Sequence, residues 1–292
     1  MKAEVTVRTD LEETLRQGVL SEPGKTWQAW MRLSNGNAYP QFDRARDARG
    51  MAIKLLDVPG AKLMSSPRHA GDQDFVMFNH PAFFVRDVAE YRSNFAAQAD
   101  GKKALAFFPS WDPRTWEIRH LIIALKTLSP APSSPVETTY NSIAPFKLGP
   151  HNIKYRVIPT PENCPAYAIP KPNTDLPNFL RSALYQQLSL DRMPACFALQ
   201  VQRQNPDYYM PIEDPSVEWD EKIAPFETVA DIRLPAQDFD STEQNLFCDN
   251  LSFNPWHALP EHRPIGGINR LRKAVYEAVS VYRHDRNAAL NQ

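Results

Sequence analysis

Proline limits the regular structure that this chain can form. The 292 residues contain 27 prolines and 10 glycines. Proline fixes the backbone φ angle, lacks an N–H donor and breaks a helix that contains it. We therefore expect short helices and strands joined by extended, rigid connections, with long ordered loops over a compact core.

A stretch near the C-terminus, residues 268–283, has the apolar repeat of an amphipathic helix. The Gly-Gly pair just before it, at 266–267, predicts a junction between a loop and that helix. Arg272, Tyr276 and Arg283 are separated by four and seven residues, so a helix projects all three side chains from nearly the same face. The apolar positions are Ile268, Leu271, Val275, Val279 and Tyr282.

The pairing of Arg272 with Tyr276 suggests metal chemistry. An arginine one turn from a tyrosine stabilises the phenolate, which is a hard anionic ligand suited to ferric iron. Tyrosine ligation of haem iron is the mark of catalases. Because Arg-x-x-x-Tyr is common on helices, the alternative is an amphipathic surface helix with a half-buried tyrosine.

Three segments of the N-terminal part carry a second, independent pattern. They read Met-Arg-Leu-Ser at 31–34, Arg-Asp-Ala-Arg-Gly-Met-Ala-Ile-Lys at 46–54 and Asn-His-Pro-Ala-Phe-Phe-Val-Arg-Asp at 79–87. In order, spacing and content they resemble conserved segments of haem catalases, and residues 268–283 resemble the proximal helix of that superfamily. The resemblance is closest to the small members, which keep the barrel core and lack the long N-terminal arm and the extra C-terminal domain.

The resemblance implies an α+β fold: a closed antiparallel β-barrel of about eight strands with surrounding α-helices, in a single domain over residues 1–292. Residue patterns predict strands at 1–7, 27–34, 48–56, 195–203 and 228–234, and a hairpin from 138–149 and 153–159. They predict helices at 88–106, 116–128 and 179–190, and a polar helix-like stretch at 11–17. The aromatic run 73–87 contains Pro81, which favours a break or an edge there.

The resemblance also implies haem b, with ferric iron, as the cofactor. On the proximal side Tyr276 would be the axial iron ligand and Arg272 would contact its oxygen. Arg283 and Arg32 match arginines that bind the haem propionates.

On the distal side, Ser34 matches the serine that orients the catalytic base, and Asn79 matches the asparagine that hydrogen-bonds the peroxide. An alignment without a gap places Phe78 at the asparagine position instead. Phe83 and Tyr91 match aromatic residues near the haem. The alternatives are a strand hydroxyl without a role for Ser34 and an ordinary core position for Phe83.

The distal base of catalases is a histidine in a Val-His-Ala-Lys-Gly segment upstream of the strand that corresponds to residues 2–7. The sequence begins after that point, so either the natural start lies further upstream or the protein lacks its base. None of the seven histidines is an obvious replacement. His80 follows Asn79 in the distal motif, but adjacent strand residues point to opposite faces.

We interpret the chain as a haem-dependent enzyme that handles peroxides, either a catalase or an organic-peroxide-dependent peroxidase, with a role in oxidative stress. Two alternatives stay open. One is a haem enzyme that rearranges fatty-acid hydroperoxides, as allene oxide synthases do, and the other is a haem-binding protein that is inactive without the distal histidine. The expected substrates are hydrogen peroxide and small organic or lipid hydroperoxides, and homo-oligomerisation is left open.

Charge, hydropathy and cysteine content limit the partners and the cellular compartment that we expect. Lysine and arginine number 33 against 34 acidic residues, which does not favour nucleic acid as a partner. No apolar run is long enough to span a bilayer. Cys164, Cys196 and Cys248 are odd in number and far apart, so we expect free thiols in a reducing compartment, the cytoplasm.

Overall fold

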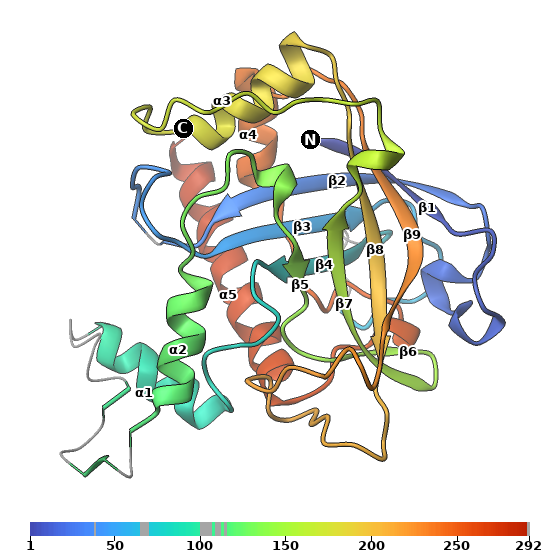
Figure 1. Ribbon diagram of the computed structural model, residues 1–292, viewed down its shortest axis with the longest axis vertical. Helices are drawn as coiled ribbons and strands as arrows, with labels where there is room; N and C mark the ends of the chain where they lie inside the picture. Colours follow the sequence, from blue (N-terminus) through green and yellow to red (C-terminus); the bar gives the residue numbers. More distant parts are fainter. Residues whose placement is uncertain (38, 65–69, 100–106, 109–111, 114–115, 291–292) are drawn as a thin grey trace.

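A closed antiparallel barrel dominates the computed structural model (Figure 1), which describes residues 1–290 except 38, 65–69, 100–106, 109–111 and 114–115. The strands are β1 (Lys2–Val7), β2 (Thr26–Asn35), β3 (Arg49–Leu55), β4 (Gln73–Phe78), β5 (Tyr140–Asn141), β6 (Phe146–Leu148), β7 (His151–Pro159), β8 (Ala195–Arg203) and β9 (Phe226–Leu234). The helices are α1 (Val88–Ala99), α2 (Ile118–Thr127), α3 (Phe179–Tyr185), α4 (Thr242–Asn250) and α5 (Gly267–Leu290). Among these helices, none is long and apolar enough to cross a membrane.

The barrel closes through the short strand β5. The sheet order is β5-β4-β3-β2-β1-β9-β8-β7-β6, and β5 pairs with both β4 and β7. Eight of the described strands therefore form a ring, while β6 pairs with β7 beside it. This closure confirms the predicted barrel, and it leaves the ring without a free edge.

Alternating side chains separate the two faces of the barrel wall. In β1 the buried residues are Ala3, Val5 and Val7, two residues apart, and they belong to the main hydrophobic core. In β3 and β4, by contrast, Ala52 and Val76 belong to a smaller cluster that includes Phe253. This second cluster also contacts Tyr276, so this part of the wall faces α5.

Helix α5 begins at a glycine pair, as predicted. Gly266 has a φ of +85°, a conformation that residues with a Cβ rarely adopt. A Cβ at Gly266 would lie 2.6 Å from the backbone oxygen of Ile212, so the close approach of that loop also requires glycine. The helix then continues to Leu290, beyond the predicted end at residue 283.

The structure differs from the predicted elements in further places. The predicted strand 138–149 is divided into β5 and β6, and the predicted helix 179–190 is α-helical to Tyr185 and ends in a π-helical turn. Strand β4 ends at Phe78, and the predicted helix 88–106 is helical to Ala99, with residues 100–106 outside the described part of the chain. The stretch 11–17 forms only a 3₁₀ turn at Glu13–Leu15. Helix α4 was not predicted because it buries no side chain and so lacks an apolar repeat, although its cap Ser241 accepts a hydrogen bond from the N–H of Gln244.

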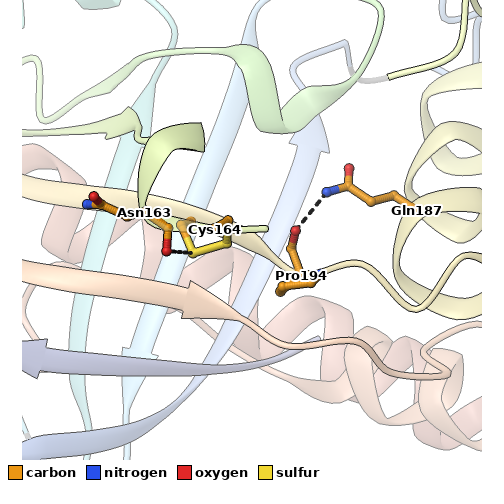
Figure 2. The surroundings of a disulfide bond; sticks show 5 residues. Asn163, Cys164, Gln187 and Pro194 are labelled. Atoms are coloured by element: carbon orange, nitrogen blue, oxygen red, sulfur yellow. Dashed lines mark hydrogen bonds between the residues drawn. A yellow bond between two sulfur atoms is a disulfide. The ribbon is translucent and has the colours of Figure 1, made fainter. Parts of the chain in front are cut away.

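The prediction that all three cysteines are free thiols is wrong. Cys164 and Cys196 form a disulfide with a Cα–Cα distance of 5.7 Å (Figure 2). Strand pairing brings them together, because β7 pairs with β8 and the N–H of Thr160 donates to the backbone oxygen of Cys196. Cys248 remains free.

Candidate functional site

A cavity of about 780 Å³ lies between α5 and the barrel. Its volume falls within the range of small-molecule and cofactor sites. Five residues of α5 line one side: Ile268, Leu271, Arg272, Val275 and Tyr276. The other lining residues follow β2, precede β3, end β4 or belong to the segment that contains α1 and α2, except Ile143, which lies between β5 and β6.

Tyr276 and Arg272 lie together on the cavity wall, as the predicted helix requires. The Arg272 guanidinium lies 5.3 Å from the centroid of the Tyr276 ring. Its Nη1 donates to Asn269 Oδ1 at 3.0 Å, and its buried Nη2 has no hydrogen-bond partner among the described residues. A buried guanidinium nitrogen without a partner is costly, which indicates that this site is built for an additional polar group.

Arg32 and Arg283 lie close to each other, but neither lines this cavity. Burial lowers the pKa of Arg32 from its usual value, and the positive charge of Arg283 lowers it further. Arg32 stacks over Phe253 at 4.8 Å, while Arg283 Nη2 donates to the backbone oxygen of Leu251 at 2.7 Å. Two positive charges held side by side favour an anionic ligand between or beside them. The binding of haem propionates by Arg32 and Arg283 stays a prediction.

Aromatic side chains form another wall of the cavity. Phe83 and Tyr91 both line it, and their predicted proximity to the haem stays a prediction. Their rings stack with 6.2 Å between centroids, and Tyr91 also stacks on Phe95 at 4.1 Å. Burial raises the pKa of Tyr91, and its proximity to Tyr276 raises that pKa further. The phenol of Tyr91 is therefore a neutral group at the cavity wall.

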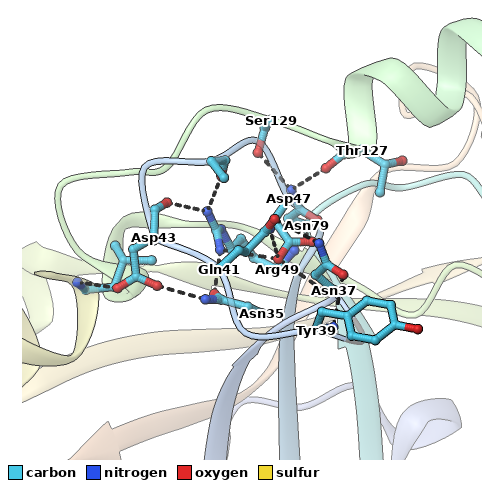
Figure 3. Close-up of polar contacts among 12 residues, drawn as sticks. Asn35, Asn37, Tyr39, Gln41, Asp43, Asp47, Arg49, Asn79, Thr127 and Ser129 are labelled. Carbon is cyan, nitrogen blue, oxygen red and sulfur yellow. Dashed lines mark hydrogen bonds and ion pairs between the residues drawn. The ribbon is translucent and has the colours of Figure 1, made fainter. Parts of the chain in front are cut away.

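Asn79 is not among the residues that line the cavity, whereas Phe78 is. The Asn79 side chain accepts a hydrogen bond from the N–H of Arg49 at 2.9 Å and donates to Thr127 O and Ser129 Oγ (Figure 3). These bonds join Asn79, just after β4, to the start of β3, the end of α2 and Ser129. Because side chains alternate along a strand, Phe78 shares the face of Val76, which faces α5. The structure thus agrees with the alignment without a gap, and a peroxide-binding role for Asn79 stays a prediction.

Ser34 also lies away from the main cavity. It is exposed near the end of β2 and lines a second cavity of about 220 Å³, together with Arg32 and Cys248. It stands opposite Gly50 of β3, where a Cβ would approach the Ser34 hydroxyl to 2.8 Å. Ser34 does not line the main cavity, so its role in orienting the catalytic base stays a prediction.

Sequence reasoning missed the polar residues at one end of the cavity. Asn37, Arg46 and Asp47 line it. The buried Asp47 carboxylate accepts hydrogen bonds from the N–H of Asn37 at 3.2 Å and from Gln41 Nε2 at 3.0 Å (Figure 3). The sequence feature that could have indicated these polar lining residues is the Arg-Asp pair at 46–47, which lies within the catalase-like motif.

Of the histidines that the structure describes, none lines the cavity. His80 is buried, and its Nδ1 lies 3.2 Å from the N–H of Ala82. His69 lies outside the described residues. The distal motif therefore brings no histidine to the cavity.

Comparisons with known proteins agree with this fold. Residues 2–117 match the family described as Catalase. Among solved structures, the chain is similar to a fungal catalase, with a TM-score of 0.73 and 17% identity, covering 97% of this chain and 57% of that one. Catalase A from Saccharomyces cerevisiae matches with a TM-score of 0.73 and 16% identity, covering 97% and 59%. A bacterial catalase matches with a TM-score of 0.71 and 17% identity, covering 97% and 55%.

The chain therefore spans less than two thirds of the length of these catalases. No curated protein matches it.

Proposed function

Because the chain has the catalase fold and its residues 2–117 match that family, we assign it to the catalase superfamily and propose that it is a haem-b oxidoreductase acting on peroxides. The proposal includes Tyr276 as a tyrosinate ligand of ferric iron. The observation that carries it is the position of Tyr276 and Arg272 together on the wall of the 780 Å³ cavity.

The residues present suit a haem in three respects. The cavity wall is mainly aromatic and aliphatic, which suits the faces of a porphyrin. Tyr276 supplies an oxygen ligand of the type that catalases use. Arg272 Nη2 is buried without a hydrogen-bond partner in the part of the chain that the structure describes, and it would be satisfied by negative charge on the phenolate and its metal.

When bound, the haem would supply the iron and the redox chemistry for cleaving a peroxide bond. The protein's contribution is orientation and electrostatics. Arg272, whose guanidinium lies 5.3 Å from the centroid of the Tyr276 ring, would help to fix the orientation of that side chain. Phe83 and Tyr91 would exclude water from the faces of the ring. Its carboxylates would have to extend beyond the cavity lining to reach Arg32 and Arg283.

The apolar wall favours organic substrates over hydrogen peroxide. Phe78 lines the cavity beside Phe83 and Phe84, where a polar side chain would be needed to orient a small peroxide. We therefore propose organic-peroxide-dependent peroxidation as the main activity. Steady-state turnover with an alkyl hydroperoxide and an electron donor should exceed turnover with hydrogen peroxide, and the reverse order would contradict this assignment.

The same apolar wall also suits a second function, the rearrangement of lipid hydroperoxides. Such a reaction consumes the hydroperoxide without an external electron donor. Product analysis with a lipid hydroperoxide in the absence of donor decides between the two. If haem binds and neither assay shows turnover, the protein is a haem-binding member that lacks catalysis, in line with the absence of a described histidine from the cavity.

Absorption spectra of the purified ferric protein test the haem site. We expect a high-spin spectrum with tyrosinate character, and we expect Tyr276→Phe to alter it or to lose the haem. Tyr282→Phe is the matched control, because Tyr282 lies on the same helix with 65% of its surface exposed. Identical spectra for the wild type and Tyr276→Phe would contradict the axial role of Tyr276.

A further inference from the structure

Two acidic side chains and a histidine meet between α1 and α2, apart from the residues that line the cavity. They are Glu90 of α1, Glu117 just before α2 and His120 in its first turn. One ligand atom from each lies within 4.8 Å of the others. Both carboxylates are half-buried, so this is not an exposed acidic patch.

His120 is an independent indication that the cluster is a ligand site. The residue is 5% exposed, and its Nδ1 makes no hydrogen bond with any described residue. Glu90 Oε1 lies 3.2 Å and Glu117 Oε2 lies 3.1 Å from this nitrogen, but neither has hydrogen-bond geometry with it. A buried ring nitrogen without a hydrogen bond requires an explanation, and a ligand between the three groups provides one.

The spacing suits a transition metal. Zinc binds imidazole nitrogen and carboxylate oxygen at about 2.0–2.2 Å, which places neighbouring ligands of a tetrahedral site about 3.3 Å apart. The distances of His120 Nδ1 to the two carboxylates are close to that value. We propose that Glu90, Glu117 and His120 bind one divalent transition-metal ion, with zinc the best match, and that water fills the fourth position.

This ion would fasten α1 to α2 beside the cavity. Tyr91 and Phe95 of α1 and Ala124 and Thr127 of α2 line the cavity, within two turns of the cluster. The ion would brace this wall without entering the cavity, because none of its three ligands lines it. It is also independent of the haem, so failure of one assignment leaves the other standing.

Arg86 opposes metal binding. Its Nη2 lies 3.4 Å from Glu90 Oε1, the same oxygen that faces His120, and 4.0 Å from Glu117 Oε1. The Arg86 side chain is 52% exposed, so a cation could displace it into solvent. Removal of this positive charge should therefore strengthen metal binding.

Equilibrium dialysis of the untagged, as-purified protein against Zn²⁺, with metal counted by mass spectrometry, tests the proposal. We expect one saturable zinc per chain, at least tenfold weaker binding in Glu117→Gln, and tighter binding in Arg86→Gln. Glu277→Gln, an exposed position on α5, should bind like the wild type. Zinc should also raise the Tm of the wild type and leave that of Glu117→Gln unchanged.

The rival arrangement is a protonated His120 paired with both carboxylates. In that case Glu117→Gln would change the Tm without zinc, while zinc binding would be weak and equal in all four proteins. Non-saturable binding, or equal affinities of the wild type and Glu117→Gln, would mean an adventitious ion only and would overturn the proposal.

Discussion

The orientation of two neighbouring residues decides the character of the candidate site. Phe78 lines the cavity, while the next residue, Asn79, hydrogen-bonds Arg49, Thr127 and Ser129 away from it. The asparagine therefore stabilises the end of β4, and the cavity receives an apolar ring. A single polar substitution tests whether the ring limits the chemistry.

We expect Phe78→Asn to raise turnover with hydrogen peroxide relative to turnover with an alkyl hydroperoxide, because the new amide can donate a hydrogen bond inside the cavity. Asn79→Ala should instead lower the free energy of unfolding by about 1–3 kcal/mol, since it removes three hydrogen bonds. Steady-state kinetics and denaturant titrations measure the two effects. If Asn79→Ala lowered turnover without loss of stability, Asn79 would be the peroxide-binding residue.

At the level of elements, the direction of α5 depends on the backbone conformation of the residues just before it. The positive φ of Gly266 and the nearby backbone of Ile212 set the direction of the helix, and the helix sets the positions of Arg272 and Tyr276. The neighbouring Gly267 has no such constraint, since the nearest atom to its added Cβ is the flexible end of Glu213 at 3.2 Å.

Gly266→Ala should therefore lower the free energy of unfolding by about 1–3 kcal/mol, because alanine is strained at this φ and meets backbone atoms. Gly267→Ala is the matched control, and we expect a change below about 1 kcal/mol. Urea titrations measure both changes in unfolding free energy, provided that the two variants and the wild type have equal m-values. Equal effects of the two variants would show that the junction does not constrain α5.

The Cys164–Cys196 disulfide is a second constraint on the arrangement of the elements, because it links the segment after β7 to β8. Its cysteines are 32 residues apart in sequence. In the chain-entropy treatment, a cross-link over that separation contributes about 3–4 kcal/mol. We expect Cys196→Ser to lower the free energy of unfolding by up to that amount, and Cys248→Ser to leave it nearly unchanged. A count of three reactive thiols in the native protein, instead of one, would contradict the bond.

At the level of the whole molecule, contacts between distant segments close the fold. The buried ring of His262 accepts a hydrogen bond from the N–H of Val19 through Nε2 at 3.0 Å, across 243 positions in sequence. Burial lowers the pKa of His262 from 6.5 to about 4. A neutral imidazole is therefore part of the folded structure.

This histidine makes stability depend on pH. Below pH 6.5 the unfolded chain binds a proton that the folded chain does not take up until about pH 4, so stability falls as the pH falls through that window. The loss by pH 4 is roughly 3 kcal/mol. We expect His262→Gln to flatten the dependence of the unfolding free energy on pH between 6.5 and 4, while His151→Gln should retain it. An unchanged slope in His262→Gln would show that other groups cause it.

Much of this architecture could be predicted from local patterns. The residue patterns of β1, β2, β3 and β8 and the helical repeat of α5 were visible because each depends only on neighbours in sequence. The placement of Arg272 and Tyr276 on one helix face follows from the same rule and is confirmed by their common cavity. The polar helix α4 escaped prediction because it has no apolar repeat.

The sequence by itself determined the strand and helix periods, the catalase-like motifs and the Arg-Tyr pair, since all of these are encoded within a few turns or residues. Only the tertiary structure decided that β5 closes the ring, that Phe78 rather than Asn79 lines the cavity, and that Cys164 meets Cys196. It also brought Glu90 to His120. Each of these outcomes depends on strand register or helix packing between distant segments, and short-range residue patterns do not specify such contacts.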